Sequence, residues 1–219
     1  MILLDEQLSK EPAKLATIDE AVEIIKQLDW ELKHSQIPGC GLAAPQIGIN
    51  KAVAIIRVDR NSGYVNLVNP RLIDGNDLIE YNEGCLSFPG QSVKTIRYGG
   101  IVVETLDDYE WHSEKLNASR YEQDMTEMPI LNHCVRSISF DVNKNDRIET
   151  QKVDQLISVC IQHEMAHLCG YDFRDFQPKE ISRNDKCPCG SNIKNKKCHN
   201  YEYYNDNLKR LFSPNYRGV

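Results

Sequence analysis

The pentapeptide His163-Glu164-Met165-Ala166-His167 carries the most information in this chain, because it places two imidazoles one helical turn apart. It lies within residues 153–170, an apolar run that is typical of a buried helix and ends at Gly170. Two such imidazoles can bind one metal ion, and a metal lowers the pKa of a water molecule to about 7. Glu164, about 100° around the helix from His163, can then take the proton from that water.

A catalytic metal site usually has a third protein ligand and an open position. Downstream of His167, no candidate for this third ligand lies in a sequence context typical of a metal ligand; the candidates are Asp172, Asp175, Glu180 and His199. Upstream, residues 83–87 (Glu-Gly-Cys-Leu-Ser) offer a thiolate in a glycine-containing turn. Residues 39–46 (Gly-Cys-Gly-Leu-Ala-Ala-Pro-Gln) offer a glycine-containing loop followed by a side-chain amide.

These three segments, in this order, resemble the signatures of the peptide deformylase family. The family patterns are Gly-x-Gly-apolar-Ala-Ala-x-Gln, Glu-Gly-Cys-apolar-Ser and His-Glu-x-Asp-His, matched at 39–46, 83–87 and 163–167. The resemblance covers residues 1–178. It implies an α+β fold in which mixed and antiparallel strands surround the metal-binding helix, and an enzyme that removes formyl from N-formylmethionyl ends of nascent peptides, releasing formate.

The resemblance also implies a set of metal ligands and a general acid/base. Cys85, His163 and His167 match the ligands, and Glu164 matches the acid/base. Family members often use Fe²⁺ and tolerate Ni²⁺, Co²⁺ or Zn²⁺, and thiolate and imidazole suit several of these metals.

Four further positions match groups that contact the substrate in the family. Gln46 and the backbone N–H of Leu86 match the donors that stabilise the oxyanion on the formyl carbonyl. Gly41 matches a backbone position that pairs with the substrate main chain. Arg97 matches a position near the bound peptide, where it could pair with substrate carbonyls or stay structural, and we interpret it as a substrate-binding residue.

The chain departs from the family pattern at Ala166, where the family helix has Asp. Position 166 lies beside His163 on the helical wheel, so a carboxylate there would support the site from outside the ligand set. Loss of such support typically costs about 10–100-fold in metal affinity or activity. We therefore expect a weakened or retuned enzyme, and a peptide-binding protein with little turnover stays open. A different metal amidase or peptidase also stays open, although Cys85 and Gln46 argue against it.

A second departure is length, since Cys85 and His163 lie 78 positions apart, several dozen more than is usual in the family. The surplus lies around residues 104–136, and 108–134 is polar with little periodicity. We interpret it as an insertion and favour a surface loop over a substrate lid or a partner-binding hairpin.

The chain's last 41 residues contain Cys187-Pro-Cys189 and Cys198-His199, two closely spaced pairs of soft ligands typical of a tetrahedral zinc site. Residues 183–199 resemble the SEC-C zinc motif, with Asn192 and Asn200 in place of glycines. The resemblance implies a closed, structural Zn²⁺ site. We expect two parts: a catalytic domain, 1–178, and a zinc-binding tail, 179–219.

Charge divides the chain at the same boundary. Residues 179–219 carry nine Lys or Arg and four Asp or Glu, whereas residues 1–178 carry 17 and 28. A basic tail favours an anionic partner, and we consider the ribosome as one candidate beside a purely structural role. The sequence offers neither a signal peptide nor an apolar run long enough for a membrane span, so we expect a cytoplasmic protein without a membrane partner.

Local patterns predict the main elements. A capping box at Thr17–Glu20 precedes a helix over 18–34. Strands are expected at 52–58 and 64–73, with further strand-like stretches at 101–103 and 138–142 and a turn at 143–146. In a reducing compartment such as the cytoplasm, the chain's eight cysteines should not form disulfides. We expect Cys40 and Cys160 near the substrate pocket and Cys134 and Cys169 as packing residues.

Overall fold

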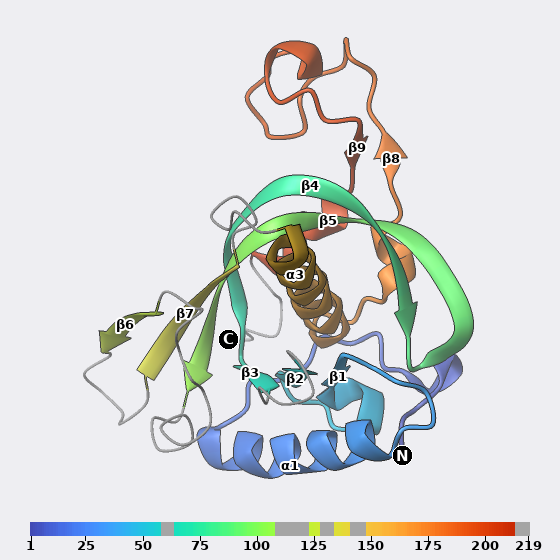
Figure 1. The fold of residues 1–219 in the computed structure, drawn as a ribbon, viewed down its shortest axis with the longest axis vertical. Helices are drawn as coiled ribbons and strands as arrows, with labels where there is room; N and C mark the ends of the chain where they lie inside the picture. Colours follow the sequence, from blue (N-terminus) through green and yellow to red (C-terminus); the bar gives the residue numbers. More distant parts are fainter. Residues whose placement is uncertain (58–63, 108–122, 128–133, 141–147, 213–219) are drawn as a thin grey trace.

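The computed structural model describes residues 1–57, 64–107, 123–127, 134–140 and 148–212. Helix α3 (Ile148–Leu168) lies at the centre of the body (Figure 1). A long hairpin over residues 71–107 curves over one side of it, and a small sheet formed within residues 41–68 lies on the other side. Helix α1 (Ile18–His34) covers the outer face of that small sheet. This is the expected α+β fold around a metal-binding helix.

Helix α1 begins where the sequence predicts it. The Thr17 Oγ accepts a hydrogen bond from the Glu20 backbone N–H at 3.3 Å, and the Glu20 carboxylate accepts one from the Thr17 N–H at 2.9 Å. One face is buried against the small sheet through Ala21, Ile24, Ile25, Leu28 and Leu32. These are the apolar positions whose spacing predicted the helix.

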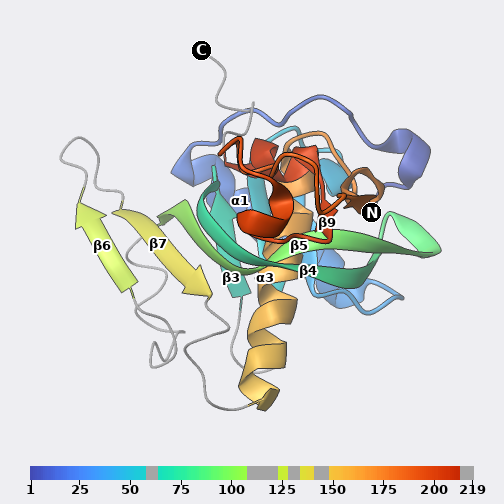
Figure 2. The ribbon, with the colours of Figure 1, turned by 90° about the horizontal axis from the view of Figure 1, so that it is seen from above.

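Both sheets are antiparallel. The first has the order β1 (Gly41–Ala43), β2 (Val53–Arg57) and β3 (Tyr64–Val68). The second has the order β4 (Arg71–Cys85), β5 (Phe88–Asp107), β7 (Cys134–Phe140) and β6 (Gln123–Glu127). Figure 2 shows β6 and β7 extending this second sheet to one side of the body.

The predicted strand over 64–73 is wrong, because it joins two strands that belong to different sheets. The chain turns at Asn69, which has a φ of 50°, and Pro70 follows. The Asn69 side chain accepts from the Ala16 N–H at 2.9 Å and donates to the Ala16 carbonyl at 2.8 Å. An asparagine that bonds in this way stabilises the left-handed conformation that separates β3 from β4.

The described residues of the insertion form strands, where the sequence predicted a loop. Strand β5 continues to Asp107, β6 lies inside the predicted loop, and β6 pairs with β7. The strand expected around Ile138 is therefore confirmed, whereas the turn at 143–146 lies outside the described residues. Helix α3 begins at Ile148 and not near 153, and Gly170 follows its end with a φ of 80°, as expected for a helix terminus.

Short 3₁₀ helices complete the body: η1 (Asp5–Gln7), η2 (Ala44–Ile47) and η4 (Phe173–Phe176). Beyond them, β8 (Lys179–Glu180) pairs with β9 (Tyr203–Tyr204), and this narrow ribbon carries residues 181–202, including η5 (Asn195–Lys197), away from the body (Figure 1). Among the described residues, no helix has both the length and the apolar character needed to cross a bilayer.

The last element, η6 (Asp206–Leu211), returns to the body and completes its core. Leu208 and Leu211 are at most 1% exposed and belong to the same apolar cluster as Ile161 and Met165 of α3. The Asn205 side chain donates to the Asp175 carbonyl within η4 at 2.9 Å and to the Gln177 carbonyl just after it at 2.8 Å. Residues 181–202 thus lie on a ribbon that leads away from the body, whereas Leu208 and Leu211 beyond them pack in the core with residues of α3, which the expected tail over 179–219 did not include.

Candidate active site and metal centres

The three expected catalytic ligands come together between β4 and α3. The ligand atoms of Cys85, His163 and His167 all lie within 4.8 Å of one another, and Cys85 Sγ is 3.3 Å from His167 Nε2. Cys85 is the last residue of β4, and both histidines project from adjacent turns of α3. Ligands about 2.1–2.3 Å from one tetrahedral ion lie about 3.5 Å apart, so the donor set fits a transition metal.

A buried carboxylate fixes the first histidine. Glu83 Oε2 lies 2.6 Å from His163 Nδ1, which leaves the Nε2 side of the ring for a metal. Burial would raise the pKa of the Glu83 carboxyl, but the charge of Arg97 and the hydrogen bond to His163 outweigh burial and hold that pKa below its usual value. The carboxylate therefore stays charged and orients the imidazole.

The two histidines differ in how they titrate. Burial lowers the pKa of His167 to about 4, so this ring is neutral and ready to bind a metal. Burial would also lower the pKa of His163, but its hydrogen bonds with Cys85 and Glu83 outweigh burial and raise the pKa well above the usual value. A metal must therefore displace a proton from His163, which makes metal binding weaker at low pH.

Glu164 has the properties of a general acid/base beside this cluster. Burial raises the pKa of its carboxyl to about 7, in the range where proton transfer near neutral pH is most efficient. Its Oε2 is buried and is one of the described side-chain atoms that have no hydrogen-bond partner. A buried oxygen without a partner favours a water molecule or a substrate group beside it.

The same carboxylate explains Gly41. A Cβ atom on Gly41 would lie 2.5 Å from Glu164 Oε1, so any other residue would displace the Glu164 side chain. Gly41 lies in β1, which is the edge strand of the small sheet. An extended peptide can therefore approach its backbone closely.

Gln46 is held with its amide aimed at the ligand turn. Its Oε1 accepts from the Ala43 N–H at 2.9 Å, which orients the Nε2 group toward Ser87 Oγ at 3.1 Å and Cys85 Sγ at 3.5 Å. Leu86 follows Cys85 in the turn between β4 and β5. The structure thus brings both expected oxyanion donors to the turn that carries the thiolate.

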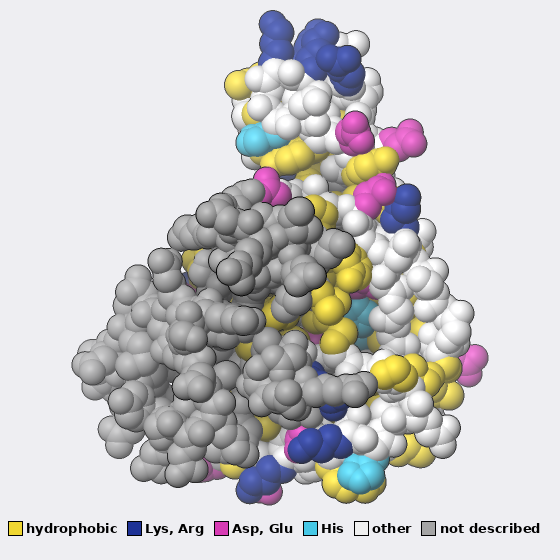
Figure 3. Space-filling model, viewed as in Figure 1, with side chains coloured by type: hydrophobic (Ala, Val, Ile, Leu, Met, Phe, Trp, Pro, Cys, Tyr) yellow, Lys and Arg dark blue, Asp and Glu magenta, His cyan; other side chains and the backbone are white. Residues whose placement is uncertain are grey.

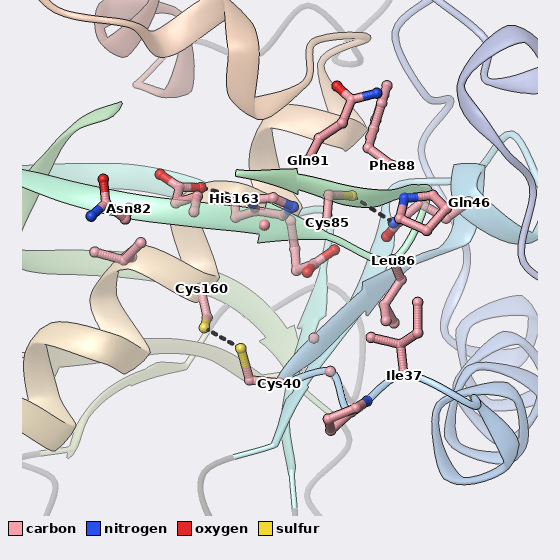
Figure 4. Close-up of a pocket in the computed structure, with 18 of the residues that line it drawn as sticks. Ile37, Cys40, Gln46, Asn82, Cys85, Leu86, Phe88, Gln91, Cys160 and His163 are labelled. Atoms are coloured by element: carbon pink, nitrogen blue, oxygen red, sulfur yellow. Dashed lines mark hydrogen bonds and ion pairs between the residues drawn. The ribbon is translucent and has the colours of Figure 1, made fainter. Parts of the chain in front are cut away.

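These groups line a pocket of about 410 Å³ (Figure 4). One wall is the loop 37–41, the second is the β4–β5 hairpin over 81–91, and the third is the face of α3 that carries Leu156, Val159 and Cys160. The pocket has an apolar side on α3 and a polar end at Gln46, Cys85, His163 and Glu164.

Arg97 lies elsewhere than expected. It is fully buried and is not among the residues that line the pocket. Its Nε donates to Glu83 Oε1 at 2.6 Å, its Nη2 donates to Glu83 Oε2 at 3.1 Å, and its guanidinium lies 4.0 Å from the centroid of the Phe176 ring. Arg97 thus forms an ion pair with Glu83 inside the body and does not line the pocket, which corrects the substrate-binding interpretation and agrees with the structural one.

Glu83 is the residue of the site that the sequence did not assign. It belongs to the quoted turn at 83–87, and its position two residues before Cys85 puts both side chains on the same face of β4. A carboxylate on the same strand face as the expected metal ligand Cys85 was the sequence signal that could have identified Glu83 as part of the site. Thr95 Oγ1 also donates to Glu83, so every contact of this carboxylate serves to hold it beside His163.

Ala166 is fully buried in the apolar cluster on α3. Its carbonyl accepts the Tyr171 N–H at 2.9 Å, just beyond the helix end. A carboxylate at this position would thus enter a dry environment and would need a partner.

A second cluster lies at the end of the β8–β9 ribbon. The ligand atoms of Cys187, Cys189, Cys198 and His199 all lie within 4.8 Å of one another, and the Sγ atoms of Cys189 and Cys198 are 3.5 Å apart. Thiolates on one tetrahedral zinc lie about 3.8 Å apart, so these four side chains fit such a site. We refer to residues 183–201 as the knuckle.

The backbone of the knuckle supports this arrangement. Asn192 and Asn200 have φ values of 59° and 52°, the left-handed conformation that glycine or asparagine tolerates. Asn195 is 1% exposed, and its side chain donates to the Tyr201 carbonyl at 2.6 Å and accepts from the Tyr201 N–H at 3.1 Å. Figure 3 shows Lys and Arg side chains gathered at the end furthest from the body. Within the knuckle, five such residues are exposed: Arg183, Lys186, Lys194, Lys196 and Lys197.

Comparison with known proteins agrees with this geometry. The family model described as polypeptide deformylase matches residues 2–126. A peptide deformylase of Prochlorococcus marinus (strain AS9601) is 31% identical over 78% of this chain and 69% of its own length. A peptide deformylase 1 of Vibrio vulnificus is 28% identical over 77% of both chains.

Solved structures agree as well. The peptide deformylase of Synechococcus elongatus in complex with actinonin is 26% identical, with a TM-score of 0.56 over 81% of this chain and 79% of that one. The Thermotoga maritima peptide deformylase, 22% identical, shares the fold with a TM-score of 0.55 over 81% of this chain and 96% of its own. With its matching sequence, fold and ligand cluster, the chain belongs to the polypeptide deformylase family.

Proposed function

We propose that the protein hydrolyses the formamide at the N-terminus of N-formylmethionyl peptides and releases formate. Besides family membership, one observation supports this most directly. The buried carboxylate of Glu164 has one oxygen without a hydrogen-bond partner among the described residues. It lines the polar end of the pocket together with Cys85 and His163, which form the ligand cluster with His167. That is the arrangement that water-dependent cleavage of an amide needs.

Binding uses the edge of β1 and the apolar wall of the pocket. The peptide main chain lies in extended form beside Gly41, where the absence of a side chain permits close contact. The first side chain of the peptide lies against Leu156 and Val159, an apolar surface that suits methionine. The formyl group then reaches the polar end of the pocket.

Catalysis follows from the donors and the carboxylate. A divalent ion held by Cys85, His163 and His167 would supply a Lewis acid for the formyl carbonyl and lower the pKa of the attacking water. Glu164 takes a proton as the water oxygen adds to the formyl carbon, and Gln46 Nε2 and the Leu86 N–H stabilise the resulting oxyanion. Glu164 then returns the proton to the departing nitrogen, the C–N bond breaks, and formate and a free amine result.

The experiment uses protein purified anaerobically and loaded with metal, and it measures formate released from formyl-Met-Ala-Ser. We expect turnover in the natural chain and none in Glu164→Ala, whereas Glu23→Gln on the exposed surface of α1 serves as a matched control that keeps turnover. Cleavage of unformylated peptides would instead indicate a different amidase or peptidase. Binding of the formyl peptide without formate release would indicate a peptide-binding protein weakened at Ala166.

The metals form a separate part of the proposal. We assign Fe²⁺ to the open Cys85, His163 and His167 site, with Zn²⁺, Ni²⁺ or Co²⁺ as substitutes, and Zn²⁺ to the closed site of Cys187, Cys189, Cys198 and His199. Elemental analysis of untagged protein is expected to give two metal ions per chain. Brief chelation should remove the catalytic ion first, because only that site keeps an open position.

The knuckle is proposed to be a SEC-C-like docking module that works in the cytoplasm, with the ribosome as its anionic partner. The five exposed lysine and arginine side chains around the closed site support this. Deleting residues 180–219 would not test it, because Leu208 and Leu211 belong to the core. Reversing Lys196 and Lys197 to Glu is expected to abolish salt-sensitive sedimentation with ribosomes, whereas reversing Lys26 on α1 leaves it intact; unchanged sedimentation of the first variant would exclude docking through the knuckle.

A further inference from the structure

Cys40 and Cys160, which the proposed hydrolysis does not use, face each other at the wall of the pocket. Their Sγ atoms are 2.7 Å apart, and both residues line the pocket (Figure 4). Cys40 lies in the loop between α1 and β1, whereas Cys160 lies on α3, three residues before His163. The two are 120 positions apart in the sequence, so only the fold brings them together.

The two thiols have unequal access to solvent. Cys40 is exposed, whereas Cys160 is only 6% exposed. A soluble oxidant can therefore reach Cys40 first, and the buried thiol of Cys160 already lies in contact with it. Such a pair, an accessible thiol beside a second thiol that can displace the oxidant, is the arrangement of a redox-responsive cysteine.

Bond formation would need little movement. A disulfide has an S–S distance of about 2.05 Å, so the two sulfurs need to approach by about 0.7 Å from their present 2.7 Å separation. Because one sulfur is carried by a loop, that approach is available without displacing α3 or its metal ligands.

We propose that Cys40 and Cys160 are the site of a reversible disulfide, formed by a low-molecular-weight disulfide such as oxidised glutathione, that ties the pocket loop to α3 and slows peptide entry. The thiolate of Cys40 attacks one sulfur of oxidised glutathione, a mixed disulfide forms, and one glutathione thiolate leaves. Cys160 loses its proton and attacks the Cys40 sulfur, releasing the second glutathione. Two protein thiols are oxidised, and one glutathione disulfide is reduced to two thiols.

The loop around Cys40 packs closely against its neighbours, so a covalent bond at its centre would restrict its remaining movement. A Cβ on Gly39 would lie 2.7 Å from Leu86 Cδ1, and one on Gly41 would lie 2.5 Å from Glu164 Oε1. The loop is thus held between an oxyanion donor and the general base. A covalent link to α3 removes the remaining freedom with which the loop admits a peptide, a consequence that rests on the proposed function.

The test treats the metal-loaded, full-length protein with oxidised glutathione and maps disulfides by mass spectrometry after alkylation of free thiols. We expect a linked pair of peptides containing Cys40 and Cys160, and a loss of about tenfold in kcat/KM for formyl-Met-Ala-Ser that dithiothreitol reverses. In Cys40→Ser the linked pair is absent, and kcat/KM is the same before and after treatment. Cys169→Ser, at a buried cysteine just beyond the end of α3, is the matched control that keeps both responses.

Two results would overturn the inference. One is complete alkylation of Cys40 and Cys160 after treatment, which would exclude the bond. The other is a mapped bond with unchanged kcat/KM, which would exclude its action on the pocket. If the reduced protein releases no formate, the proposed function fails, but peptide mapping and the affinity for formyl-Met-Ala-Ser before and after oxidation still decide this inference.

Discussion

Glu83 Oε2 lies 2.6 Å from His163 Nδ1, and this contact connects the metal cluster to the interior of the body. Behind Glu83 lies Arg97, which is fully buried and bonds to both carboxylate oxygens. The chain of contacts runs from a guanidinium through a carboxylate to an imidazole. Each member fixes the charge and the orientation of the next, so the ligand ring is held before any metal arrives.

Glu83→Gln should therefore weaken metal binding by about 10–100-fold, because the amide keeps the shape but loses the charge that supports His163. It should also lower the free energy of unfolding by about 3 kcal/mol, since Arg97 would keep a buried charge without a counter-ion. Competition with a chelator and denaturant unfolding measure the two effects.

Two variants separate these effects. Glu80→Gln on the same strand weakens contacts with Lys94, at 2.9 Å, and with Tyr203, neither of which is a metal ligand, and should leave the metal affinity unchanged. Adding Arg97→Met to Glu83→Gln should recover part of the stability but none of the metal affinity. Recovery of metal affinity in that double variant would contradict the role assigned to Glu83.

The ligand cluster was predictable because it depends on short-range spacing. His163 and His167 follow from helical geometry, and Cys85 and Gln46 follow from motifs only a few residues long. The ion pair of Glu83 with Arg97 was not predictable from spacing, because it depends on the register of β4 against β5. That register shifts between Gly84 and Cys85. When the register is irregular, the residue that faces a given position cannot be found by counting residues from the turn. Arg97 was therefore interpreted as a substrate-binding residue, whereas it lies behind Glu83.

The predicted domain boundary at residue 178 shows again that a local sequence pattern does not reveal tertiary contacts. A change in charge marks where the chain leaves the body, but charge does not show where it comes back. Leu208, Leu211 and Phe212 have helical spacing, which was a local signal for burial. What they pack against, α3 and Tyr98, is a tertiary relationship that no spacing contains.

Leu211→Ala should accordingly destabilise the whole body. Leu211 is fully buried in the cluster that contains Ile161 and Met165, so truncation leaves a cavity in the core and should lower the free energy of unfolding by about 2–5 kcal/mol. Leu15→Ala, at a position 43% exposed, is the control with little expected change. A Leu211→Ala protein as stable as the natural chain would show that the C-terminal segment is dispensable.

Ala166→Asp tests whether the missing carboxylate limits the site. Because position 166 is fully buried, the new carboxylate should lower thermal stability unless it gains a partner. If it supports His163, the rate of metal loss to a chelator should fall or turnover should rise, by up to about tenfold. Ala166→Asn is the matched control of similar size without charge, and equal metal retention and turnover in all three proteins would exclude the argument.

The pH dependence of stability should report the burial of Glu164 directly. In the folded chain the pKa of its carboxyl is raised by burial from 4.5 to about 7, so the folded state holds a proton that the unfolded state releases between these values. The free energy of unfolding of chelator-treated protein should therefore decrease as the pH rises through this window. The total change is about 3 kcal/mol, and the stability is fully present below pH 4.5.

Glu164→Gln cannot ionise, so it should lack this decrease while keeping the contributions of His163 and His167. Subtracting the unfolding free energy of the natural chain from that of the variant isolates the carboxylate: the difference should grow from pH 4.5 to 7 and remain constant above that. Parallel curves for Glu164→Gln and the natural chain would mean that Glu164 ionises as freely as it does in water, and it would then lack the pKa that suits it to proton transfer near neutral pH.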